Sequence, residues 1–115
     1  MVDDQPEMAE TIADGLSDRG YEVVATSSGR DALARLAAER FDALVTDLRM
    51  PQVDGLALLR ASLALGPSRP VITMTGCGVA DAEIQARDQG AYHHLVKPFR
   101  LDELARLIER ALKGS

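Results

Sequence analysis

Five residues of the sequence carry side chains that together could handle a phosphoryl group. They are Asp3 and Asp4 near the start of the chain, then Asp47, Thr75 and Lys97, and each follows a short, mostly apolar run. Two carboxylates about 4 Å apart repel by roughly 4 kcal/mol at an effective dielectric near 20, so such a cluster needs a divalent cation or a proton. Oxygen ligands alone favour Mg²⁺ over Zn²⁺.

This set of groups matches the needs of phosphoryl transfer. A hard cation with open positions neutralises phosphoryl oxygens, while Lys97 adds a charge and the Thr75 hydroxyl a hydrogen bond. Asp47 is then the candidate nucleophile. Taken singly, the residues have structural explanations, because an Asp pair favours a helix start, Thr75 could cap a helix and most lysines are surface charges. Their coincidence at successive strand ends favours the functional interpretation.

The elements that must position these residues follow from hydrophobic periodicity. Apolar and β-branched runs predict strands at 21–26, 43–47, 70–74 and 94–96. Helical spacing predicts helices at 8–16, closed by Gly20, at 28–40 with Ser28 as the cap, at 56–63 before Gly66-Pro67, at 80–89 and at 101–112. Apolar strands that are each followed by a helix describe a doubly wound α/β fold with a parallel sheet. Ligands of such folds bind beyond the carboxyl ends of the strands.

Composition describes one domain over residues 1–115, with 46% hydrophobic and 27% charged residues and a net charge of −5. A single cysteine, Cys77, excludes an intramolecular disulfide and suits a reducing compartment, so we expect a cytoplasmic location. No run approaches the ~20 apolar residues of a membrane span, and no leader follows Met1. The acidic balance without any basic run disfavours direct binding of nucleic acid.

The motifs around these residues resemble the receiver domain of bacterial two-component response regulators, over essentially the whole chain. The motifs are Val2-Asp3-Asp4, Thr46-Asp47-Leu48-Arg49-Met50-Pro51 followed by Asp54-Gly55, Met74-Thr75-Gly76, Gly90-Ala91 and Lys97-Pro98-Phe99. Any one motif is weakly specific, but the set in this order is highly specific. The resemblance implies a flavodoxin-like, CheY-like fold, a five-stranded parallel sheet of strand order 2-1-3-4-5 flanked by five helices.

The resemblance also implies a role for each site residue. Asp47 would accept a phosphoryl group from a phosphohistidine on a sensor histidine kinase. Asp4, Asp47 and the backbone carbonyl of Arg49 would bind Mg²⁺ directly, and Asp3 mostly through water. Lys97 would pair with the phosphoryl oxygens, and Thr75 would move to hydrogen-bond them. The peptide bond between Lys97 and Pro98 is expected to be cis.

Three positions near the site are particular to this chain. The family usually has Tyr or Phe at the position of His94, with a ring that swings inward when the threonine moves. A histidine could fill that slot and titrate near neutral pH, or it could be a half-exposed histidine on an edge strand. Arg49 and Cys77 stand where this family tunes the access of water to the phosphoryl group. We expect Arg49 to slow self-hydrolysis and Cys77 to be a small loop residue.

Two features of the elements suggest where the chain is weakly packed. The helix at 80–89 offers only Ile84 and alanines to the core, so it should dock least stably. Together with the His94 strand and the last helix, it is expected to form the surface that changes on phosphorylation. Only Met1 and Val2 precede Asp3, so we expect a gap in the sheet, and either the sequence is truncated within its first strand or its numbering starts late.

The residues of these motifs are most similar to those of the nitrogen- and dicarboxylate-regulatory class. In that class, the receiver precedes an ATPase that activates transcription. Receivers of hybrid histidine kinases are similar too. The expected result of phosphorylation is homodimer formation or docking of an output domain. Two rival functions are a Mg²⁺-dependent phosphohydrolase of external substrates and an interaction module that is not phosphorylated. A chain of 115 residues leaves little room for a substrate pocket, which favours a phosphoacceptor over an enzyme.

Overall fold

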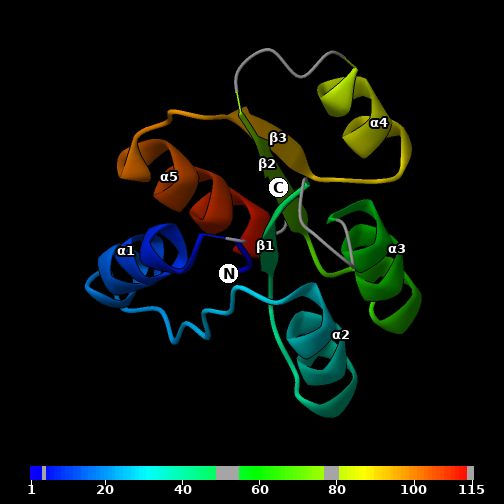
Figure 1. The fold of residues 1–115 in the computed structure, drawn as a ribbon, viewed down its shortest axis with the longest axis horizontal. Helices are drawn as coiled ribbons and strands as arrows, with labels where there is room; N and C mark the ends of the chain where they lie inside the picture. Colours follow the sequence, from blue (N-terminus) through cyan, green and yellow to red (C-terminus); the bar gives the residue numbers. More distant parts are fainter. Residues whose placement is uncertain (4, 49–54, 77–80, 114–115) are drawn as a thin grey trace.

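A three-stranded parallel sheet forms the centre of the computed structural model, which describes residues 1–3, 5–48, 55–76 and 81–113 (Figure 1). The strands are β1 (Leu44–Asp47), β2 (Val71–Thr75) and β3 (His93–Val96), in that order across the sheet. The helices are α1 (Pro6–Ser17), α2 (Gly29–Ala38), α3 (Gly55–Leu65), α4 (Ala82–Asp88) and α5 (Leu101–Leu112). Strands and helices alternate from β1 onward, as the predicted α/β fold requires.

Two further segments extend the sheet beyond β1 through single residues. Val2 forms parallel bridges to Thr46 on one side and to Thr26 on the other. The amide of Val2 donates to the carbonyl of Val45 at 2.8 Å, and the amide of Asp47 donates to the carbonyl of Val2 at 2.9 Å. The order of the five segments across the sheet is therefore the predicted 2-1-3-4-5.

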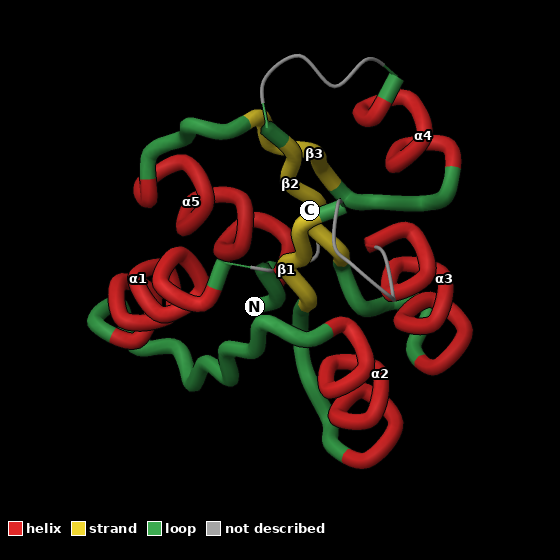
Figure 2. The backbone as a smooth tube through the Cα atoms, viewed as in Figure 1, coloured by secondary structure: helices red, strands yellow, loops and turns green. Residues whose placement is uncertain are grey.

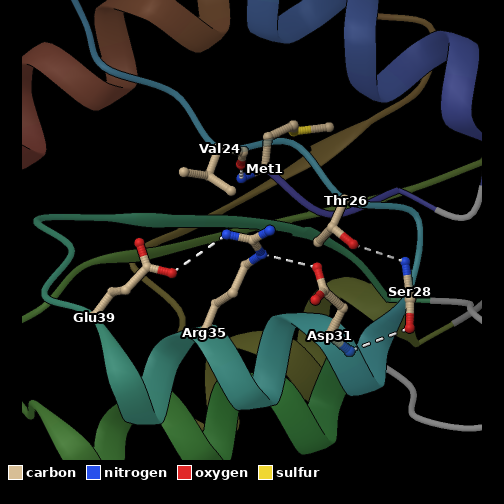
Figure 3. A network of polar contacts seen from close by, with 7 residues as sticks. All are labelled: Met1, Val24, Thr26, Ser28, Asp31, Arg35 and Glu39. Atoms are coloured by element: carbon tan, nitrogen blue, oxygen red, sulfur yellow. Dashed lines mark hydrogen bonds and ion pairs between the residues drawn. The ribbon is translucent and has the colours of Figure 1, made fainter.

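The predicted strand at 21–26 is wrong except at Thr26. Residues 21–25 form no strand, and Thr26 alone is bridged. In the described structure, the neighbouring segment contacts the backbone of this run only at Val24 and Thr26, which is too little for a ladder. Val24 does accept a hydrogen bond, at 3.0 Å, from the amino group of Met1 (Figure 3).

The expected gap lies at this end of the sheet. A cavity of about 330 Å³ opens there, and Met1, Tyr21, Val23, Phe41 and Ala43 are among the residues that line it. Burial lowers the pKa of the Met1 amino group from 8.0 to about 6, since the charged form loses hydration there. The sheet is thus well formed at the carboxyl ends of its strands and incomplete at the opposite end.

The helices pack on both faces of the sheet. Figures 1 and 2 show α1 and α5 side by side, and α2 and α3 together away from them. Side chains alternate along a strand, so Ile72 and Met74 pack with the α1 and α5 cluster, whereas Val71 packs with the α2 and α3 cluster. All residues of β1 and β2 are buried, as their apolar runs predict.

The predicted cap of α2 is present and is reinforced by neighbouring side chains. Ser28 Oγ accepts a hydrogen bond from the Asp31 amide at 3.2 Å, and the Ser28 amide donates to Thr26 Oγ1 at 3.1 Å (Figure 3). Arg35 forms ion pairs with Asp31 and Glu39 one turn to either side. These contacts connect the start of α2 to Thr26, the residue bridged to Val2.

α4 contributes less to the core than the sequence suggested. Ile84 was expected to face the core but is 57% exposed, so that prediction is wrong. Ala86 is fully buried, and it packs near Leu48, Leu56 and Ala91. A helix of seven residues that is anchored by an alanine gains little from burial, which agrees with the expectation that this helix docks weakly.

Candidate functional site

Three of the predicted site residues meet at the carboxyl ends of the strands. Asp3 follows the bridged residue Val2, Asp47 ends β1, and Lys97 follows β3. Lys97 Nζ donates to Asp3 Oδ2 at 2.7 Å and to Asp47 Oδ2 at 3.2 Å. One ammonium group therefore joins two carboxylates from distant parts of the chain.

The backbone of the sheet fixes these side chains in place. The Lys97 amide donates to the carbonyl of Thr75 at 2.7 Å, and the Leu48 amide donates to the carbonyl of Met74 at 2.9 Å. Asp3 Oδ1 accepts a further hydrogen bond from the Gln5 amide at 3.0 Å. The peptide bond between Lys97 and Pro98 is cis, the form that the resemblance implies.

The site is buried and keeps a net negative charge. Asp3 is fully buried and Asp47 is 5% exposed. Burial lowers the pKa of Lys97, but the hydrogen bonds and charges of Asp3 and Asp47 outweigh it, so this pKa lies above its ordinary value. Two buried carboxylates against one ammonium leave one negative charge uncompensated among these three groups. Such a site favours an additional cation or a charged ligand that brings one.

Thr75 lies at the same edge of the sheet, but His94 engages its hydroxyl. Thr75 Oγ1 and His94 Nε2 are 2.9 Å apart, and Thr73 Oγ1 and His94 Nδ1 are 2.6 Å apart. Both threonines are buried on β2, and Thr73 stands opposite His94 in the ladder with β3. His94 is half-buried on an edge strand, as one interpretation proposed, but both of its ring nitrogens have hydrogen-bond partners.

Gly55 is a structural residue of the site at the start of α3. A Cβ at this position would lie 2.2 Å from the carbonyl oxygen of Asp47 and 2.6 Å from the Cα of Leu48. The first turn of α3 thus packs directly against the backbone that carries Asp47, an approach that no side chain permits. The Asp-Gly motif was the available signal.

The remaining predicted residues, Asp4, Arg49 and Cys77, lie outside the described residues. Within the described part of the chain, no group of three or more His, Cys, Asp or Glu side chains could hold a metal ion. Two of the four predicted ligands, Asp3 and Asp47, are described. Their donors are carboxylate oxygens with a surplus of negative charge, which fits a hard cation such as Mg²⁺.

Residues 1–109 match the family described as the response regulator receiver domain. The structure is similar to the receiver domain of NtrX from Brucella abortus, with a TM-score of 0.91 and 33% identity over 99% of this chain and 97% of that one. It is also similar to a receiver domain protein from Clostridium thermocellum, with a TM-score of 0.91 and 31% identity over 97% of this chain and 90% of that one.

Two curated relatives are transcriptional regulators. The DNA-binding transcriptional regulator NtrC of Salmonella typhimurium is 39% identical over 97% of this chain and 24% of its own length. The C4-dicarboxylate transport transcriptional regulatory protein DctD of Rhizobium meliloti is 38% identical over 96% of this chain and 24% of its own length. They confirm the predicted similarity to the nitrogen- and dicarboxylate-regulatory class.

The chain spans about a quarter of the length of these relatives. In the ranges that the structure describes, no helix is long and apolar enough to cross a membrane. The family match covers all but the last residues of the chain, and the elements, their order and the similar structures agree with it. The chain therefore belongs to the response regulator receiver domain family.

Proposed function

We propose that Asp47 is the phosphoacceptor of this domain. A carboxylate oxygen of Asp47 attacks the phosphorus of a phosphohistidine on a sensor histidine kinase. The new P–O bond forms as the P–N bond breaks, and the imidazole leaves with the electron pair. The observation that carries this proposal is the contact of Lys97 with both Asp3 and Asp47, because it places an ammonium group beside the attacking oxygen in a buried site.

The side chains around Asp47 have separate roles in this proposal. Lys97 pairs with the phosphoryl oxygens, and the Thr75 hydroxyl donates a hydrogen bond to them. Asp4, Asp47 and the backbone carbonyl of Arg49 would hold Mg²⁺, and Asp3 would assist through water. This cation supplies charge neutralisation at the phosphoryl oxygens. Arg49 is proposed to limit the access of water to the acyl phosphate.

Phosphorylation is proposed to change the conformation of the face made by α4, β3 and α5. Phosphorylation adds charge and three acceptor oxygens at Asp47, and the conformation that binds them better becomes more populated. Ile84 on α4, Tyr92 in the segment before β3 and Val96 at the end of β3 are 57%, 39% and 49% exposed. Apolar side chains on this face suit contact with a second copy of the domain or with an output domain.

The full-length protein is proposed to be a cytoplasmic regulator of transcription. This part of the proposal rests on the curated relatives, which are named transcriptional regulators and are about four times as long as the aligned region. The receiver itself is not expected to contact DNA, because its net charge is −5. A sensor histidine kinase and an output domain are the expected partners.

The test uses acetyl phosphate as a small donor in the presence of Mg²⁺. Intact mass spectrometry of the chain should show one added phosphoryl group that is lost on treatment with hydroxylamine, as an acyl phosphate requires. Asp47→Asn should abolish the adduct, while Asp42→Asn, at an exposed aspartate ahead of β1, should retain it. Rapid turnover of the donor without an adduct would instead indicate a phosphohydrolase.

A further inference from the structure

Thr73 is a buried polar residue that the proposed function leaves unexplained. Its side chain is fully buried on β2, two residues before Thr75, so both hydroxyls lie on the same face of the strand. The ring of His94 spans them, with Nδ1 2.6 Å from Thr73 Oγ1 and Nε2 2.9 Å from Thr75 Oγ1. The two threonines and the histidine therefore form one hydrogen-bonded chain.

We propose that Thr73 is a positioning residue that acts on Thr75 through His94. By donating to Nδ1, Thr73 keeps the ring proton on Nε2, and Nε2–H then donates to Thr75 Oγ1. The single hydroxyl hydrogen of Thr75 remains available for a phosphoryl oxygen on Asp47. This inference rests on the proposed function, because it explains how the Thr75 hydroxyl is kept ready to donate to a phosphoryl group on Asp47.

The count of hydrogens favours this arrangement over its reverse. A neutral imidazole has one N–H donor and one acceptor nitrogen, so the two hydroxyls must play opposite roles toward it. Among the described residues, His94 is the hydrogen-bond partner of Thr73 Oγ1, which has no contact with solvent. If Nδ1 carried the proton, the buried hydrogen of Thr73 would lose its acceptor, which is unfavourable. Thr75 would also donate its own hydrogen to Nε2, so this hydrogen would no longer be available for a phosphoryl oxygen.

The surroundings of His94 keep its ring in the neutral form that this argument requires. Burial lowers the pKa of His94, the nearby His93 lowers it further, and Glu83 of α4 acts in the opposite direction. Burial is the largest of these effects, so the pKa of His94 lies below its ordinary value although Glu83 raises it. A protonated ring would present two donors and leave the Thr73 hydrogen without an acceptor, which also opposes protonation.

The test measures the tautomer of His94 by ¹⁵N NMR of the imidazole nitrogens, with the exposed His93 as an internal reference. Thr73→Val keeps the shape of the side chain without the hydroxyl, and Thr73→Ser keeps the hydroxyl. In the wild-type chain and in Thr73→Ser, Nε2 should carry the proton and Nδ1 should accept a hydrogen bond. In Thr73→Val, the Nδ1–H population should rise. A wild-type proton on Nδ1, or identical tautomer populations in all three chains, would overturn the inference.

The rate of phosphorylation by acetyl phosphate tests the effect of Thr73 on function. Thr73→Val should slow formation of the acyl phosphate about five-fold, the factor of roughly one ordinary hydrogen bond, and Thr73→Ser should restore the rate. An unchanged rate in Thr73→Val would contradict the positioning role. If even the wild-type chain is not phosphorylated, the proposed function fails, while the NMR result still decides whether Thr73 sets the tautomer.

Discussion

At the scale of single residues, the charge balance around Lys97 is the most consequential feature of the site. Its ammonium group contacts Asp3 and Asp47, both of which are buried. Buried carboxylates that lose a shared cationic partner repel each other more strongly and cannot recover full hydration. Lys97 therefore holds the site together before any phosphoryl group arrives.

Replacing Lys97 should reveal this role as a loss of stability. Lys97→Met should lower the free energy of unfolding at neutral pH by about 3 kcal/mol, because one counterion serves two buried charges. Added Mg²⁺ should recover part of the loss by supplying positive charge. Urea unfolding with and without Mg²⁺ measures both effects. Lys113→Met is the control, since Lys113 pairs with Glu109 on the surface and should contribute little. Equal stability of the two variants would refute the assigned role.

The amino group of Met1 should make stability depend on pH. Its pKa is 8.0 when exposed and about 6 in the folded chain, so the folded chain binds fewer protons between these values. Stability should therefore rise with pH across this window and be lost as the pH falls through it, by up to about 2.7 kcal/mol from two pKa units.

Unfolding by urea at several pH values measures this dependence. Acetylation of the Met1 amine removes the titrating group, so the acetylated chain should show a flatter profile between pH 6 and 8. His94 also has a lowered pKa, and because its ordinary value is 6.5 it can contribute at the lower end of this window but not near pH 8. A slope that is unchanged by acetylation would exclude the Met1 amine as its source.

At the scale of elements, the join between β1 and α3 controls where Asp47 points. A Cβ on Gly55 would overlap the carbonyl oxygen of Asp47, so the strand or the helix must shift. Gly55→Ala should lower the free energy of unfolding by about 1–3 kcal/mol, the usual cost of overpacking. It should also slow phosphorylation, because the shift moves Asp47. Gly76→Ala is the stability control, because a Cβ there meets nothing within 4 Å. Wild-type stability and phosphorylation in Gly55→Ala would contradict the close approach.

α4 should be the least protected helix. Its buried side chain in the described structure is Ala86, whereas α5 buries Leu104, Ala105 and Ile108. Helices with little buried apolar surface open at lower free energy, so amide hydrogen exchange in α4 should be faster than in α5. Native-state exchange followed by NMR measures this directly. Equal protection of α4 and α5 would contradict the prediction that α4 docks weakly.

At the scale of the whole molecule, much of the fold and part of the site follow from sequence patterns. Apolar runs and helical spacing predicted the helices and the strands at the centre of the sheet. The same patterns placed Asp3, Asp47 and Lys97 at one edge, because parallel strands end on the same side. These predictions succeed since burial of apolar surface decides both the elements and their direction.

Other features depend on contacts between distant segments, which local patterns do not encode. The run at 21–26 has strand propensity, but a strand also needs a continuous partner, and the described structure bridges this run through Thr26 alone. Ile84 fits a helical stripe yet lies exposed, because the packing of α4 depends on its partners. The histidine bridge between Thr73 and Thr75 needs the register of β2 and β3, which only the structure gives.

The most direct test of the account locates the phosphoryl group itself. The wild-type chain is incubated with acetyl phosphate and Mg²⁺, then reduced with borohydride, which converts an aspartyl phosphate to homoserine. Peptide sequencing by mass spectrometry then identifies the modified position. We predict homoserine at position 47 and unmodified aspartate at all other aspartate positions. Homoserine at another position, or none at all in a chain that is folded and saturated with donor, would contradict the assignment of Asp47.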